Sequence, residues 1–217
     1  MSKVFSGHQP NFLPYMGVFY KMYKSDVFVL DDDVQYSKSG LHNKNAMILG
    51  GKRKDIVVPV TYDYGDKINE ARVFYESAWD RKMLKSIQCN YRKAPHFEEG
   101  YEFLERHLAK EYTFLADLNI GLIKEIADRM GLGCKIIIAS KDVPTGLKNN
   151  ARNVYQCLAC GCDTYYSGTG GKAYNDQLMY DANEIKIVYS DYEPIDDNLS
   201  VLDYILKNGF EIPSEWK

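Results

Sequence analysis

The sequence predicts an α/β protein with a Rossmann-like core of parallel strands, an inserted β-hairpin and a helical middle segment. The first 30 residues carry a strand, a short loop, a helix and a wholly apolar strand in succession, which is the pattern of a right-handed βαβ unit. Apolar runs of strand length recur at residues 135–139 and 185–189, whereas residues 80–131 show helical periodicity.

The first βαβ unit can be assigned closely. Val4–Ser6 is predicted to be a strand that ends at Gly7, and the loop His8–Pro14 follows. Its two prolines fix φ and remove backbone donors, so we expect a stiff loop. Tyr15–Lys24 is predicted as a helix because its apolar residues fall at helical spacing. Val27–Leu30 is an unbroken apolar run, as in a strand buried on both faces.

The middle of the chain continues with strands and then changes to helices. Residues 45–49 and 55–60 flank the basic sequence Gly51–Lys54, so we expect a hairpin with the basic residues in its turn. Arg72–Tyr75 is predicted as a further strand. Helices are predicted at Asp80–Tyr91, Phe97–Leu108 and Thr113–Met130.

The last third returns to alternating elements. Strands are predicted at residues 135–139, 164–166 and 185–189, and helices at residues 150–159 and 200–206. Ser200 is a predicted N-cap, and Gly209 is expected to end the last helix. We expect one domain over residues 1–217, with residues 80–131 as a helical insertion or cap.

Composition and charge narrow the class of protein. The 217 residues are 45% apolar and 26% charged, as in ordinary globular domains. A net charge of −3 without a basic stripe argues against a grip on nucleic acid. No apolar stretch has the length of a signal peptide or a membrane span. We therefore expect a cytoplasmic protein; the oligomeric state is left open.

The five cysteines are unevenly spaced, which makes a poor disulfide framework. Cys157 and Cys160 lie one helical turn apart, and no second pair stands at zinc-finger spacing. We expect them to be small core side chains rather than metal ligands.

His8 is the first candidate for chemistry. It follows the first predicted strand, and open parallel sheets bind ligands at the carboxyl ends of their strands. A histidine there can act as a general base near neutral pH; the alternative is a structural histidine that bonds a loop carbonyl. Gln9 and Asn11 flank it and can bind substrate amides or hydroxyls, or hold the loop.

Three adjacent carboxylates, Asp31 to Asp33, follow the second strand of the unit. Strand alternation places Asp31, Asp33 and Gln35 on one side and Asp32 on the other. Carboxylates this close are best tolerated beside a positive group. The sequence leaves open a Mg²⁺ ion, a substrate amine or a solvated strand end.

A glycine-rich sequence, Ser167–Lys172, follows the strand at residues 164–166, with Tyr174 just beyond it. Glycines let backbone N–H groups approach an anion, and Lys172 can neutralise one. The spacing is neither that of a Walker loop nor GxGxxG. A phosphate or carboxylate cradle and an ordinary glycine turn are both open.

A polar cluster at residues 42–45 precedes the predicted hairpin. Asn43 and Asn45 can bind substrate, and Lys44 can pair with the aspartates or with a phosphate. The alternative is simply the polar start of a strand.

Several segments, in their order along the chain, resemble the WbqC-like protein family. They are His8–Gly17, Asp26–Val29, Asp32–Gln35, Asn43–Asn45, Val58–Val60, Tyr165–Gly168 with Lys172 and Tyr174, and Leu199–Asp203. Two residues depart from the family pattern. Tyr15 stands where tryptophan is common. Lys44 stands where arginine is common, and a lysine cannot bind a carboxylate or phosphate in the bidentate manner of arginine.

The resemblance implies a link to bacterial surface-polysaccharide (O-antigen) biosynthesis, for which glycine or other aminoacyl transfer to an amino sugar has been proposed. We therefore hypothesise an N-acyl or aminoacyl transferase with an activated acyl donor and a nucleotide-linked amino sugar as its partners. His8 would accept the amine proton, and Asp31 or Asp33 would orient the amine or the imidazole. The predicted substrate contacts are Gln9, Asn11, Tyr15, Gln35, Asn43, Lys44, Asn45, Ser167, Gly168, Lys172 and Tyr174.

Two other functions stay open. A strand followed by a histidine loop, a helix and a buried strand is also similar to the opening of class I nucleotidyltransferases, although this chain lacks their paired HxGH histidines. Such an adenylate-forming or nucleotidyl-transfer enzyme would place Mg²⁺ near the aspartates. The third hypothesis is a non-catalytic sugar-nucleotide-binding protein.

Overall fold

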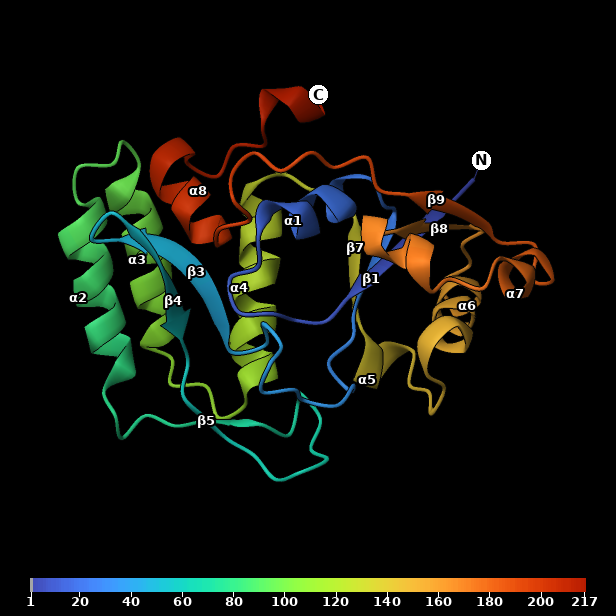
Figure 1. Cartoon of the computed structure of the whole chain (residues 1–217), viewed down its shortest axis with the longest axis horizontal. Helices are drawn as coiled ribbons and strands as arrows, with labels where there is room; N and C mark the ends of the chain where they lie inside the picture. The colour runs from blue at the N-terminus through green and yellow to red at the C-terminus, as the bar shows by residue number, and fades with distance from the viewer. Residues whose placement is uncertain (1) are drawn as a thin grey trace. The chain divides into compact units, whose positions relative to one another are not determined.

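A computed structural model describes residues 2–217, which form two compact units (Figure 1). The first, which we call the sheet unit, contains the residues up to Gln9 together with Gly17–Asp33 and Leu132–Glu193. The second, the helical unit, contains Pro10–Met16, Val34–Gly131 and Pro194–Lys217. Residues 80–131 belong to the helical unit.

The sheet unit is built on five parallel strands in the order β7-β2-β1-β8-β9. They are β1 (Val4–His8), β2 (Val27–Leu30), β7 (Lys135–Ile138), β8 (Thr164–Ser167) and β9 (Lys186–Tyr189). Every residue of β2 is buried, as its apolar run predicted. The all-parallel sheet with flanking helices confirms the Rossmann-like α/β class.

The order of the strands reverses beside β1. The chain runs from β1 outward to β2 and then β7, and it returns to the other side of β1 for β8 and β9. In open parallel sheets this reversal opens a crevice at the carboxyl ends of the two strands concerned. Here those strands are β1 and β8, which end at His8 and Ser167.

The first strand is longer than predicted. Its ladder with β2 continues until His8 lies opposite Leu30, and Asp31 donates its N–H to the His8 carbonyl at 2.9 Å. His8 is therefore the last residue of β1 rather than a loop residue. The sequence did not predict this extension, because Gly7 is a poor strand former and was expected to end the strand.

Helices complete the sheet unit: α1 (Met16–Tyr23), α5 (Ala139–Asp142), α6 (Asn149–Ala159) and α7 (Gln177–Asp181), with a 3-10 turn, η1 (Thr169–Ala173). One apolar cluster joins strands to α6 and α7, with Phe5, Val29, Val154 and Tyr180 among its members. Cys157 is fully buried in the same cluster. Burial raises its pKa to about 12, so the thiol behaves as the small core side chain that was expected.

The helical unit contains two short antiparallel pairs and the longer helices (Figure 1). The strands are β3 (Lys44–Leu49), β4 (Lys52–Val57), β5 (Val60–Thr61) and β6 (Arg72–Val73). The helices are α2 (Trp79–Tyr91), α3 (Phe97–Leu108), α4 (Leu115–Arg129), α8 (Val201–Asn208) and the 3-10 turn η2 (Ser214–Trp216). The apolar residues at helical spacing in α4 form one buried stripe: Leu115, Leu118, Leu122, Ile123 and Ile126.

Two local predictions for this unit have different outcomes. The hairpin turn consists of Gly50 and Gly51, both with positive φ, which suits a two-residue connection. The prediction that the basic residues form the turn is therefore wrong: Lys52 already begins β4. At the other end of the chain, the Ser200 side chain caps α8 by accepting from Leu202 N–H at 3.2 Å, as predicted. In residues 2–217 no helix is long and apolar enough to cross a membrane.

Candidate functional site

His8 lies at the carboxyl end of β1, at the reversal of strand order. Its Nδ1 is 2.8 Å from the carbonyl oxygen of Gln9. Because a carbonyl only accepts, Nδ1 must carry the hydrogen, and the lone pair of the neutral ring is then on Nε2. His8 thus makes the loop-carbonyl hydrogen bond that the structural alternative predicted, and Nε2 is the nitrogen of its neutral ring that can accept a proton.

Lys21 of α1 reaches the same strand end, although the sequence did not single it out. Its Nζ donates to the Gly7 carbonyl at 2.6 Å, and the residue is only 7% exposed. Burial lowers the pKa of Lys21 to about 8, with the Asp31 carboxylate acting in the opposite direction. The feature of the sequence that could have indicated this residue is a lysine among the apolar residues of the predicted helix.

Asp31 and Asp33 share one partner, Arg152 of α6. Arg152 Nε donates to Asp31 Oδ1 at 2.9 Å, and its Nη2 pairs with both Asp31 and Asp33. Gln156 Nε2 adds a 2.7 Å hydrogen bond to the same Asp31 oxygen. Asp32 instead accepts from the N–H and hydroxyl of Ser140 at 2.9 and 2.5 Å. Asp32 therefore has a different partner from Asp31 and Asp33, but β2 ends at Leu30 and residues 32 and 33 form a turn, so the strand alternation predicted for residues 31–35 is wrong.

This network determines what the carboxylates are able to bind. Burial raises the pKa of Asp31, against the opposing effects of Gln156 and Arg152. The other Asp31 oxygen, Oδ2, lies 3.4 Å from where a Cβ on Gly7 would stand, so it faces the end of β1. A Mg²⁺ ion shared by Asp31 and Asp33 does not fit, because the Arg152 guanidinium already bridges them. Across residues 2–217, no group of three His, Cys, Asp or Glu side chains is arranged to hold a metal.

The glycine-rich segment forms η1 at the end of β8. Ser167 is buried, and its Oγ accepts from Asn175 Nδ2 at 3.1 Å. The Lys172 side chain is exposed, with Nζ 5.5 Å from the centre of the Tyr189 ring. Tyr174 is 67% exposed. Lys172 and Tyr174 therefore lie on the surface of the sheet unit and are accessible to a ligand.

Six predicted site residues lie in the helical unit: Asn11, Tyr15, Gln35, Asn43, Lys44 and Asn45. Asn43 and Asn45 donate to the carbonyls of Val58 and Leu13 at 2.8 and 2.7 Å. Asn11 Oδ1 is 3.2 Å from Nδ1 of the buried His42. Gln35 forms a backbone bridge with Lys67. Burial raises the pKa of the Tyr15 hydroxyl, and Lys44 is half-buried in β3.

Asn119 of α4 is a further polar residue that sequence reasoning missed. It is fully buried, and its Nδ2 donates to the carbonyls of Pro10 and His42 at 2.7 Å each. Within the described part of the chain its Oδ1 has no hydrogen-bond partner. The feature of the sequence that could have indicated Asn119 is an asparagine among the apolar residues that share one face of the predicted helix. Together with Asn45, it holds the backbone of the Pro10–Pro14 segment.

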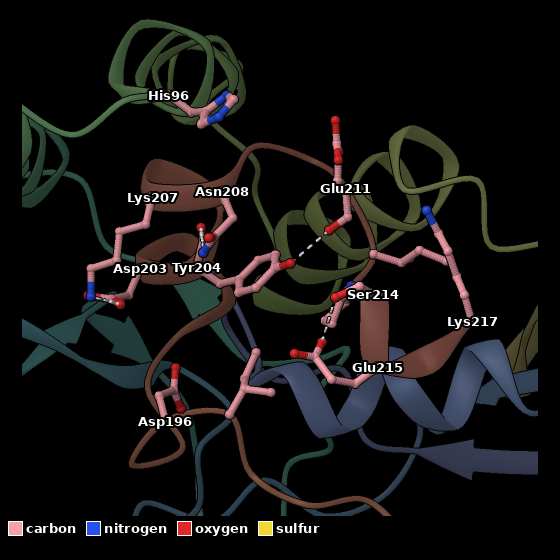
Figure 2. Close-up of a pocket in the computed structure, with 13 residues that line it drawn as sticks. His96, Asp196, Asp203, Tyr204, Lys207, Asn208, Glu211, Ser214, Glu215 and Lys217 are labelled. Carbon is pink, nitrogen blue, oxygen red and sulfur yellow. Dashed lines mark hydrogen bonds and ion pairs between the residues drawn. The ribbon is translucent and has the colours of Figure 1, made fainter.

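A pocket of about 620 Å³ also lies within the helical unit (Figure 2). It is formed by α8 and the segments around residues 195 and 211–217, with His96 at one side. Its polar groups already contact one another: Lys207 pairs with Asp203 at 2.6 Å, and Tyr204 donates to the Glu211 carbonyl at 3.0 Å. None of the predicted site residues lines it, so the candidate site remains at the strand ends of the sheet unit.

Comparisons with known proteins give a family and one curated relative. The model of the WbqC-like protein family matches residues 9–214. The chain is 26% identical over 218 aligned positions to "Uncharacterized protein Rv1507c" of Mycobacterium tuberculosis (strain ATCC 25618 / H37Rv), covering 94% of each chain. No solved structure matches the chain.

Proposed function

The chain belongs to the WbqC-like protein family, and we propose that it transfers an acyl or aminoacyl group to the amine of a nucleotide-linked amino sugar. The observation that carries this proposal is the position of His8 at the reversal of strand order, where its Nδ1 binds the Gln9 carbonyl and Nε2 is the basic nitrogen of the neutral ring. The family resemblance suggests bacterial surface-polysaccharide (O-antigen) biosynthesis as the setting.

His8 acts as the general base in the proposed step. The amine nitrogen attacks the carbonyl carbon of the activated acyl donor, and a C–N bond forms while the bond to the thiolate or alkoxide leaving group breaks. Nε2 takes the proton that the amine loses and returns it to the leaving group. A positioned base of this kind contributes roughly 10²–10⁴-fold to the rate.

Asp31 orients the amine in this proposal. Its Oδ1 is occupied by Arg152 and Gln156, whereas Oδ2 faces the end of β1 beside Gly7. An amine N–H can donate to Oδ2, and the fixed Oδ1 prevents the carboxylate from turning. Asp33 acts indirectly, because it anchors the other side of Arg152.

The η1 segment supplies the proposed nucleotide contacts. Lys172 offers a positive charge for a phosphate, and the exposed Tyr174 ring offers a face for the sugar or base. Ser167 ends β8 beside the end of β1, and Gly168 follows it. The six predicted contacts from the helical unit remain predictions.

A second candidate function is nucleotidyl transfer. It is favoured by the strand order, because a histidine at the end of the first strand and a glycine-rich turn after β8 both adjoin the same reversal. Here His8 would stabilise the transferring phosphate, and Mg²⁺ would be supplied with ATP. A non-catalytic sugar-nucleotide binder would use the same strand ends.

A thermal-shift screen separates these functions. The panel contains nucleotide-linked amino sugars, ATP with and without Mg²⁺, and acyl-CoA or aminoacyl donors. A ligand at a hundredfold excess over Kd stabilises the fold by about 2.7 kcal/mol. We expect a shift with amino-sugar nucleotides that is lost in Lys172→Ala and kept in Lys186→Ala, an exposed lysine of β9. A shift only with ATP and Mg²⁺ would overturn acyl transfer in favour of nucleotidyl transfer.

A further inference from the structure

The pocket of the helical unit (Figure 2) takes no part in the proposed reaction or its alternatives. Its volume of about 620 Å³ lies in the range of sites for small organic ligands. Ten of the 13 residues that line it carry polar side chains, and the three apolar ones are Ile195, Ile212 and Pro213. Because sites for apolar ligands have mostly hydrophobic walls, this lining favours a ligand with polar groups around its whole body.

The ring of Tyr204 is held inside the pocket. Tyr204 belongs to α8, and its hydroxyl donates to the Glu211 carbonyl at 3.0 Å, so the ring lies across the pocket (Figure 2). Burial raises the pKa of this hydroxyl, and the charges of Glu215 and Glu211 raise it further, so both carboxylates lie near the ring. A held aromatic ring offers a flat apolar face without a further entropic cost, and the C–H face of a sugar ring packs on such a face.

Asp196 supplies a hydrogen-bond acceptor at the wall of the same pocket. Its Oδ1 accepts from the Leu199 N–H at 3.0 Å, whereas the Lys207 ammonium pairs with Asp203. Burial raises the pKa of Asp196, and the charge of Asp203 raises it further. A partly desolvated carboxylate binds a ligand O–H more strongly than a solvated one does, because the hydrogen bond is charge-assisted and lies in a lower dielectric.

The charges of the lining disfavour an anionic ligand. One of its four carboxylates, Asp203, is paired with Lys207 at 2.6 Å. The other three share the lining with one further lysine, Lys217. With the histidine of the lining neutral, two negative charges remain, and they repel phosphate groups. A nucleotide-linked sugar is therefore a poor ligand for this pocket.

We propose that the pocket of the helical unit binds an unphosphorylated mono- or disaccharide, with a sugar ring on the Tyr204 face and hydroxyls donating to Asp196 and the neighbouring carboxylates. Sugar hydroxyls both donate and accept hydrogen bonds, so they match a lining that mixes carboxylates with ammonium and amide donors. This inference goes beyond the proposed function and does not rest on it, because the nucleotide-linked amine is placed at the strand ends of the sheet unit.

Isothermal titration calorimetry on the full chain tests this with maltose, cellobiose and N,N′-diacetylchitobiose as uncharged probes. We expect at least one of them to bind with millimolar or better affinity. Tyr204→Ala should weaken this binding about tenfold, because the face for the sugar ring is lost. Asp196→Asn should weaken it several-fold. Asp128→Asn is the matched control, at an exposed aspartate of α4 outside the pocket, and should leave the binding unchanged.

Lys172→Ala separates this pocket from the strand ends, because it should keep saccharide binding while it loses the binding of amino-sugar nucleotides. If Tyr204→Ala does not fold, Asp196→Asn decides alone. Absence of binding by all three saccharides, or binding that is equal in wild type and Asp196→Asn, would overturn the inference. Binding of spermidine without binding of any saccharide would also overturn it, because the pocket would then act only through its negative charge.

Discussion

The Oγ atom of Ser167 lies 2.1 Å from the position that a Cβ atom on Gly171 would occupy. Asn175 Nδ2 lies 2.9 Å from the same position. Real Cβ contacts are never this short, so residue 171 must be glycine for η1 to close against the end of β8. The conformation of the glycine-rich segment therefore depends on the close packing of Gly171 against Ser167, and not only on the number of glycines in the segment.

Gly171→Ala should displace Ser167 and disturb η1. We expect a loss of about 1–3 kcal/mol in the free energy of unfolding, the usual cost of overpacking, measured by urea denaturation. Gly170→Ala is the matched control, because no atom lies within 4 Å of its added Cβ. The double variant Ser167→Gly/Gly171→Ala should recover much of the loss. Equal stability of the two single alanine variants would contradict this packing.

Arg152→Met should be strongly destabilising. It leaves Asp31 and Asp33 buried without their common cation, and removing one partner of a buried pair costs about 3–5 kcal/mol. The free energy of unfolding of Arg152→Lys should lie between those of wild type and Arg152→Met, because an ammonium lacks the planar fork that reaches both carboxylates. Chemical denaturation measures all three. A loss below about 1 kcal/mol in Arg152→Met would show that the network contributes little to the fold.

The ionisation of Lys21 should appear in the pH dependence of stability. Burial lowers its pKa from 10.5 to about 8 in the folded chain. Between these values the unfolded chain binds more protons, so the free energy of unfolding rises with pH across this window. Relative to Lys21→Met, wild type should gain up to roughly 3 kcal/mol from pH 8 to pH 10.5. A constant difference between the two proteins would show an ordinary pKa for Lys21.

The carbonyl of Leu13 is held by two buried donors in the helical unit. Asn45 Nδ2 donates at 2.7 Å and Ser200 Oγ at 3.0 Å, and Leu13 itself has a positive φ of 43°. Asn45→Ala should therefore lower the free energy of unfolding by about 1–3 kcal/mol. Asn183→Ala, at an exposed asparagine that donates to the Met179 carbonyl, is the control. Equal effects of the two variants would mean that Asn45 does not anchor this segment.

Periodicity and apolar runs were sufficient to predict most of the long elements. The range of α3 and that of β2 are as predicted, because each has one clear pattern over its whole length. The short elements α5, α7, η1 and η2 are too brief to show a period. The extension of β1 to His8 depends on hydrogen bonds to β2, which no local pattern of the strand contains.

The candidate site was predictable in position but not in its partners. His8 and Ser167 were recognisable because residues that follow buried strands meet at one edge of a parallel sheet. Arg152 lies 121 residues from Asp31, and only the folded sheet unit brings the two together. Lys21 and Asn119 are polar residues within apolar stripes, and a local pattern cannot distinguish such a residue from a solvated one.

The most direct test of the central claim compares turnover by wild type and His8→Asn. Asparagine can still donate to the Gln9 carbonyl but has no basic nitrogen, so it isolates the proposed proton transfer from the local structure. Mass spectrometry would follow the acylated amino-sugar nucleotide at saturating acceptor and donor, with the ligands taken from the thermal-shift screen. We predict a fall of roughly 10²–10⁴-fold in His8→Asn with acceptor binding retained. Equal product formation by the two proteins would contradict the role of His8 as the base.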